Sequence, residues 1–193
     1  MRLRLGLLAA AVVVGGMASE ACMTESGVCQ GGAQADPYNL EALFCAKHRR
    51  YFQQALEELE TGHKRSCWAW YVFPTAPFVA NGRERGSMHN RQYALRDEPP
   101  SGLSGDRAAR AFLRFEAGGI NLRANLVTIM TVVAVQLERG VTPHQLVGGD
   151  ATRLRASLEL FERVGSERGE GAGGAAFDGE VAGLCARAIL AMG

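Results

Sequence analysis

The sequence carries almost no net charge and almost no lysine. Its 21 basic and 20 acidic residues leave a formal net charge of +1, and lysine occurs only at Lys47 and Lys64. A nucleic-acid-binding domain normally shows a basic face or a strongly basic overall composition. We therefore expect no nucleic-acid partner, and we attribute the excess of arginine over lysine to the base composition of the gene.

The sequence also lacks the spacing of a metal site. Its five cysteines form no C-x-x-C pair, and its four histidines form no ligand cluster with them, whereas structural zinc sites depend on such spacing. We expect each histidine at the surface. The cysteines are interpreted as buried or free thiols, with a Cys22–Cys29 disulfide as the alternative in an oxidising compartment.

No familiar catalytic motif is present. The sequence has no P-loop, no nucleophile elbow, no zinc-protease motif and no dinucleotide-binding fingerprint after a strand. The motifs therefore indicate no cofactor, no metal and no particular reaction.

The apolar run near the N-terminus is too short to cross a membrane. It covers residues 5–14, whereas a membrane-spanning helix needs about 20 apolar residues. Arg2 and Arg4 precede the run and small residues around Ala21 follow it, which is the pattern of a secretory signal. We predict a signal or targeting segment over residues 1–21 and no transmembrane span.

This leader decides the expected compartment. If it functions, the protein enters the secretory pathway or an organelle. The alternatives are an N-terminal helix of the mature domain, or a true start at Met17, and the protein is then cytoplasmic. Residues 22–35 are rich in small and polar residues, which predicts a flexible linker.

Helical periodicity dominates the rest of the chain. Apolar residues recur at spacings of three and four, and strand signals are nearly absent. We predict an all-α fold: a compact multihelical single domain over residues 36–164, a Gly-rich linker over 165–176 and a terminal helix over 177–193. Within the domain, a polar connection is expected over 79–105 with a helical turn at 88–95, and helices near 37–61, 104–117, 121–138, 142–147 and 150–164.

The first of these helices has clear terminal signals. Asp36 and Pro37 together predict its start, because Asp can accept hydrogen bonds from unpaired N–H groups and Pro suits the first helical position. Gly62 predicts its end. The charged face, which includes Glu57 and Glu58, is interpreted as solvated and nothing more.

Three later helices also have start signals. Asn121 is a good N-cap for the most apolar helix, which is expected at the centre of the bundle. Thr142 begins a capping box with Pro at the first helical position. Asp150 is expected to cap the helix that follows.

The stretch from His63 to Thr75 holds both tryptophans, Trp68 and Trp70. Residues 67–73 are apolar without a break, so periodicity cannot distinguish a short strand from a buried helical turn. A lone buried strand would leave its backbone groups unpaired, and no partner strand is evident. We therefore predict a short buried helix that ends at a proline.

The same stretch carries a resemblance to a known family. A W-x-W element closely followed by F-P, with a serine–tyrosine element and a Gly-Asp element later in the chain, resembles the small bacterial domains catalogued as domain of unknown function 1810. The matching residues are Asp36, Pro37, Gly62, Lys64, Trp68, Trp70, Phe73, Pro74, Ser87, Arg91, Tyr93, Gly149, Asp150, Arg153, Leu154, Ser157, Leu160 and Phe161. The resemblance covers residues 36–164 and implies an all-α multihelical fold with no established activity.

The chain departs from the family pattern on both sides of the tryptophans. Cys67 stands where the family has a histidine, and Thr75 stands where it has a glutamine. If the family uses that histidine in catalysis, this chain lacks the group.

One functional hypothesis is a small-molecule site for a nucleotide or an ADP-ribose-like ligand. Tryptophan rings could stack on a base, basic side chains could meet phosphates, and a carboxylate could orient a hydroxyl or act as a base. The candidate ligand-binding residues are Lys64, Trp68, Trp70, Arg91, Tyr93, Asp150 and Arg153. However, aromatic runs of this kind are more often core, and an Asp before a helix is more often an N-cap.

The hypothesis that the sequence favours is an uncharacterised helical binding or scaffold module with no assignable reaction. The partner of such a module is unidentified, and the polar connection at 79–105 would present its binding surface. A small anionic ligand is the alternative to a macromolecular partner. This hypothesis predicts no deep polar pocket beside the tryptophans. Convergence of the candidate residues on one concave site would count against it.

Overall fold

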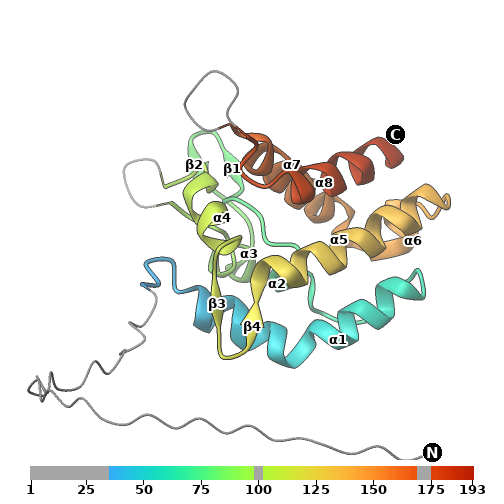
Figure 1. Ribbon diagram of the computed structural model, residues 1–193, viewed down its shortest axis with the longest axis horizontal. Helices are drawn as coiled ribbons and strands as arrows, with labels where there is room; N and C mark the ends of the chain where they lie inside the picture. Colours follow the sequence, from blue (N-terminus) through green and yellow to red (C-terminus); the bar gives the residue numbers. More distant parts are fainter. Residues whose placement is uncertain (1–34, 98–101, 169–174) are drawn as a thin grey trace, which may run out of the picture. The chain divides into compact units, whose positions relative to one another are not determined.

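The computed structural model describes residues 35–97, 102–168 and 175–193 (Figure 1). Within these ranges α-helices dominate, and the strands are confined to two short hairpins. The predicted all-α multihelical fold is therefore confirmed. The predicted leader and residues 22–34 of the predicted linker, with Cys22 and Cys29, lie outside the described residues.

The first helix begins later than predicted. Its π-helical first turn, η1 (Glu41–Cys45), leads directly into α1 (Ala46–Glu60). The Asp36 carboxylate accepts hydrogen bonds of 2.7 and 2.9 Å from the backbone N–H groups of Leu40 and Glu41 at the start of the helix, as an N-terminal Asp should. Pro37, however, lies in a turn before the helix and not at its first position.

The end of α1 agrees with the prediction. Gly62 has a φ of 76°, in the left-handed region that glycine adopts easily. Its N–H donates to the carbonyl of Leu59, and the N–H of His63 donates to the carbonyl of Glu58. These bonds satisfy carbonyl groups that the helix would otherwise leave unpaired at its end.

The most apolar helix, α5 (Leu122–Glu138), lies at the centre of the fold. It packs against α1 and against α8 (Gly179–Ala191), and α8 packs in turn against α7 (Ala151–Ser166); Figure 1 shows this arrangement. The predicted central position of this helix is thus confirmed. No helix in the described part of the chain is both long and apolar enough to span a membrane.

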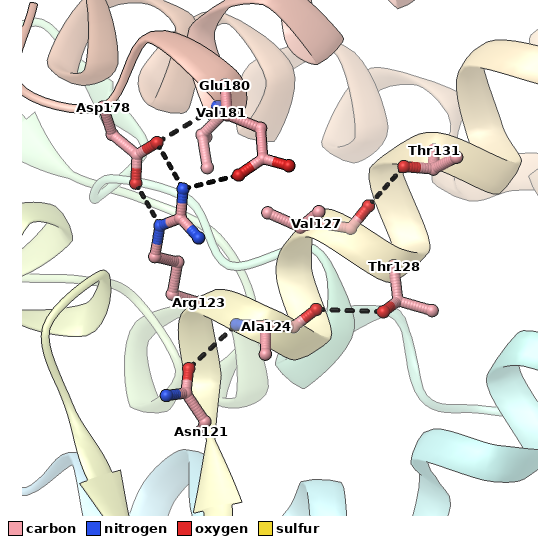
Figure 2. A network of polar contacts seen from close by, with 9 residues as sticks. All are labelled: Asn121, Arg123, Ala124, Val127, Thr128, Thr131, Asp178, Glu180 and Val181. Atoms are coloured by element: carbon pink, nitrogen blue, oxygen red, sulfur yellow. Dashed lines mark hydrogen bonds and ion pairs between the residues drawn. The ribbon is translucent and has the colours of Figure 1, made fainter.

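A polar cluster joins the start of α5 to the start of α8 (Figure 2). Asn121 caps α5, because its side chain accepts from the backbone N–H three residues later. Arg123 donates to both carboxylate oxygens of Asp178, at 2.6 and 2.9 Å, and to Glu180 at 2.7 Å. Asp178 also caps α8 through the N–H of Val181. The cluster fixes the terminal helix, whose existence the sequence predicted, against the central one.

The α7 helix extends further than predicted, into the region assigned to a Gly-rich linker. It continues to Ser166 and includes Gly165, which is buried. A Cβ atom at Gly165 would lie 2.8 Å from the backbone oxygen of Asp178 and 3.1 Å from Ala182. Glycine is therefore required here by the close approach of α8 and not by flexibility.

Two β-hairpins interrupt the helices and were not predicted. β1 (Val79–Ala80) pairs with β2 (Arg83–Glu84), and β3 (Glu116–Ala117) pairs with β4 (Ile120–Asn121). The first turn is Asn81-Gly82, with φ of 54° and 68°. An Asn-Gly pair is a strong hairpin signal, so the sequence carried the information for this element.

The remaining helices are short. α3 (Met88–Gln92) confirms the helical turn expected inside the polar connection, and α4 (Asp106–Phe112) covers part of the helix expected after it. α6 (Pro143–Val147) begins with the predicted capping box at Thr142. A 3-10 turn, η2 (Gly148–Asp150), then leads into α7.

Candidate functional site

The aromatic stretch forms the predicted short buried helix, α2 (Ala69–Val72). Trp68, just before it, is fully buried and packs edge-on against Phe73, with ring centroids 5.6 Å apart. The ring of Trp68 is therefore unable to stack on a ligand, and this residue belongs to the core.

Glu58 of α1 holds this stretch in place, which corrects its assignment to a solvated face. It is buried and accepts from the indole N–H of Trp68 at 2.8 Å, from the backbone N–H groups of Arg65 and Ser66 at 2.7 and 3.0 Å, and from the Ser66 hydroxyl. Burial raises the pKa of Glu58, but the hydrogen bonds from Ser66, Arg65 and Trp68 outweigh it and lower the pKa to about 2.

Trp70, within α2, has a different environment. It is half-buried, and its indole N–H donates to Oδ1 of Asn90 in α3 at 3.0 Å. The same oxygen accepts from Nη2 of Arg153 in α7 at 2.5 Å. The ring is contacted by Arg153, 6.0 Å from its centroid, and by His89 at a centroid distance of 5.2 Å. Three separate helices therefore meet at one amide side chain.

A cavity of about 490 Å³ lies beside this junction. Its polar wall includes Trp70, Asn90 and the first turn of α7, and its apolar wall includes Pro77, Phe78 and Leu160. Phe78 is 63% exposed, which is unusual for a large aromatic side chain unless it meets a ligand or a partner.

Asp150 lines the cavity but does not act as the side-chain N-cap that the sequence predicts for α7. Its carboxylate instead pairs with Nζ of Lys64 at 2.7 Å. Lys64 also lies 5.5 Å from the centroid of the Trp68 ring. This ion pair joins the segment before α2 to the start of α7.

Arg153 is the least satisfied side chain of the wall. Its Nη1 is buried and has no hydrogen-bond partner among the described residues. Burial lowers the pKa of Arg153, and the negative charge of Asp150 opposes that shift. A guanidinium remains charged in proteins, so the fold keeps a cation here with most of its donors unused.

The comparisons with known proteins agree with this helical arrangement. A model of the family described as protein of unknown function, DUF1810, matches residues 37–173. The chain belongs to this family. The family's description names no activity, so membership assigns no reaction to the chain.

A solved structure shows a similar fold. It is the crystal structure of the conserved hypothetical protein Rv1873 from Mycobacterium tuberculosis, with a TM-score of 0.58 and 20% sequence identity over 81% of this chain and 91% of that one. At this identity the similarity concerns the fold alone. No curated protein matches the chain.

The structure brings together some of the predicted site residues of this DUF1810 member. Trp70, Asp150 and Arg153 line the cavity, and Lys64 contacts it through Asp150. Trp68 lies behind the site in the core. The other two candidates lie outside the cavity wall: Arg91 is exposed on α3, and Tyr93 is buried against Phe44 and Tyr71.

Asn90 and Phe78 are two of the cavity residues that sequence reasoning missed. Asn90 follows the N-cap Ser87, whose hydroxyl accepts from its backbone N–H, so it looks like an ordinary residue of a helix start. Phe78 directly follows Pro77 and directly precedes the β1–β2 hairpin. The two residues that depart from the family pattern lie in different surroundings. Thr75 lines the cavity, whereas Cys67 is exposed and is not part of the cavity wall.

His48 corrects the expectation that every histidine lies at the surface. It is buried, with Nε2 2.8 Å from the carbonyl oxygen of Tyr71 and Nδ1 3.0 Å from the side-chain amide of Asn125. Burial lowers its pKa to about 4. Among the described residues, no group of three or more His, Cys, Asp or Glu side chains could hold a metal ion.

Proposed function

We propose that this protein is a binding module and that its ligand occupies the cavity beside Trp70. The observation that carries the proposal is the half-buried, charged Arg153, whose buried Nη1 lacks a partner within the described ranges. A buried polar group without a partner lowers stability, so in a native structure such a group calls for an explanation, for example a role in binding or catalysis. The exposed Phe78 on the opposite wall adds an apolar contact surface.

The geometry favours a small molecule over the stacking of a nucleotide base between the tryptophans. Trp68 is fully buried, and the ring of Trp70 is already contacted by Arg153 and His89. A volume of about 490 Å³ suits a compact ligand. The proposed site therefore corresponds to the small-molecule alternative from the sequence, with Trp70, Asp150 and Arg153 at its wall, and not to a partner surface on the polar connection.

The test is a fragment screen by NMR on the ¹⁵N-labelled protein, with neutral, cationic and anionic compounds. We expect fragments that shift the amide signals of Asn90, Asp150 and Arg153 together. Ala156, which is exposed and lines the cavity, offers a way to block it by the substitution Ala156→Phe. Its matched control is Ala46→Phe on α1, at an exposed alanine away from the cavity.

Binding should disappear in the Ala156→Phe variant and persist in the Ala46→Phe control. If no fragment shifts the cavity signals, or if the blocked variant binds as well as the control, the proposed function is wrong.

A further inference from the structure

The charges that line the cavity are unevenly paired. Four charged side chains contribute to its wall, and three of them have an oppositely charged partner: Asp150 with Lys64, Glu159 with Arg155, and Arg163 with Asp106. Arg153 has no carboxylate within ion-pair distance in the described part of the chain. The site therefore has one cation whose counter-charge the fold does not supply.

Asn90 is a weak substitute for that counter-charge. Its neutral amide oxygen accepts from Arg153 at 2.5 Å while also accepting from the indole of Trp70 at 3.0 Å. A guanidinium presents five N–H donors in a planar fork that matches a carboxylate. A single shared amide oxygen uses only one of those donors, so a stronger acceptor would displace it.

From this imbalance we propose that the cavity binds a small carboxylic acid, with the carboxylate paired to Arg153. The apolar body of the ligand would lie along Pro77, Phe78 and Leu160, which line the same cavity. The inference rests on the proposed function and names the ligand class for that site. Because Nη1 is covered by protein, the guanidinium turns away from Asn90 as the ligand enters.

A carboxylate fits this wall better than a phosphate. Asp150 and Glu159 also line the cavity, and like charges at this range raise the energy of a second negative charge on the ligand. Arg163 and Lys64, the other nearby cations, are already paired with carboxylates. The single unpaired guanidinium of Arg153 neutralises the charge of a monoanionic carboxylate, but only half of the charge of a dianionic phosphate.

The experiment compares three probes that share one apolar body. These are 2-naphthoate, its neutral amide 2-naphthamide, and the dianion 2-naphthyl phosphate, each titrated into the ¹⁵N-labelled full chain. We expect 2-naphthoate to bind about tenfold more tightly than the amide and more tightly than the phosphate. Shifts at Asn90 and Arg153 locate the binding.

Two variants and one control variant assign the preference to Arg153. Arg153→Gln should bind acid and amide equally, whereas Arg107→Gln, which removes the same charge from an exposed position on α4, should keep the preference. Asn90→Asp supplies an internal carboxylate to the guanidinium at nearly unchanged shape. It should therefore also reduce the acid preference to about twofold or less, and it decides the matter if Arg153→Gln does not fold.

The possible outcomes separate the carboxylate inference from the proposed function. Equal affinity for acid and amide in the wild-type protein, or a preference that survives in Asn90→Asp, overturns the carboxylate inference but leaves the cavity as a binding site. Tighter binding of 2-naphthyl phosphate than of 2-naphthoate also overturns the carboxylate inference. Absence of any shift in the cavity with all three probes contradicts both this inference and the proposed function.

Discussion

The two tryptophans stand two positions apart in the chain, yet they have opposite environments. Trp68 is fully buried and donates to Glu58, a carboxylate that also receives two backbone N–H groups. Trp70 is half-buried at the wall of a cavity and shares its acceptor with a cation. One environment has all its polar groups satisfied, and the other does not.

This difference separates a structural role from a functional one. Around Glu58, the strong acceptor meets several donors, so the cluster stabilises the fold without any further molecule. Around Arg153, the strong donor meets a weak acceptor and retains a buried N–H group without a partner in the described structure. An unsatisfied charge beside a cavity is where a ligand gains most from binding.

The largest expected effect comes from truncating the two rings separately. Trp68→Ala should lower the free energy of unfolding by about 3–5 kcal/mol, because it empties a fully buried site. Trp70→Ala should cost only about 1–2 kcal/mol, because that ring is partly exposed and already borders a cavity. Urea denaturation of both variants measures the two losses of unfolding free energy. Equal losses would mean that the two rings contribute alike to the fold.

A pH-dependent effect should mark Glu58. Since its pKa is depressed from 4.5 to about 2 in the fold, its contribution to stability is complete above pH 4.5 and is lost as the pH falls toward 2. Glu58→Gln should therefore cost about 2–3 kcal/mol at pH 7, and the difference from wild type should shrink across that window.

The control for Glu58 is its exposed neighbour Glu57 on the same helix. Glu57→Gln should change the stability by less than about 0.5 kcal/mol at any pH. A Glu58→Gln penalty that stays constant from pH 7 to pH 2 would show that the carboxylate charge does not anchor the aromatic stretch.

The smallest expected effect is a gain in stability from a substitution beside Trp70. Asn90→Asp gives Arg153 a charged acceptor inside the fold, so we expect the free energy of unfolding to rise by about 0.5–1 kcal/mol in thermal or urea denaturation. A loss of stability would mean that Arg153 is already adequately satisfied, and the two environments would then be alike.

The sequence predicted the helices well because their signals are local. The capping box at Thr142, the N-cap Asn121 and the stop at Gly62 each depend on bonds to residues a few positions away. The prediction omits the hairpin at Asn81-Gly82 although its signal is equally local, because it treats the surrounding segment as a polar connection with one helical turn.

Three other errors concern residues whose role depends on distant neighbours. Glu58 and His48 were assigned to the surface by residue type, but long-range packing buries both. Gly165 was assigned to a linker because it begins a Gly-rich segment, whereas the close approach of α8 explains it. In each case a general preference was overridden by tertiary contacts.

The sequence by itself determined the helical class, most helix boundaries and the family, because periodicity, caps and a W-x-W motif are written in consecutive residues. Only the tertiary structure decided which tryptophan is core and which borders a site. It did so by bringing Arg153 to Asn90, 63 residues away in the chain, and by burying Glu58 beneath Trp68. Burial and charge pairing depend on which segments pack together, and no local pattern encodes that.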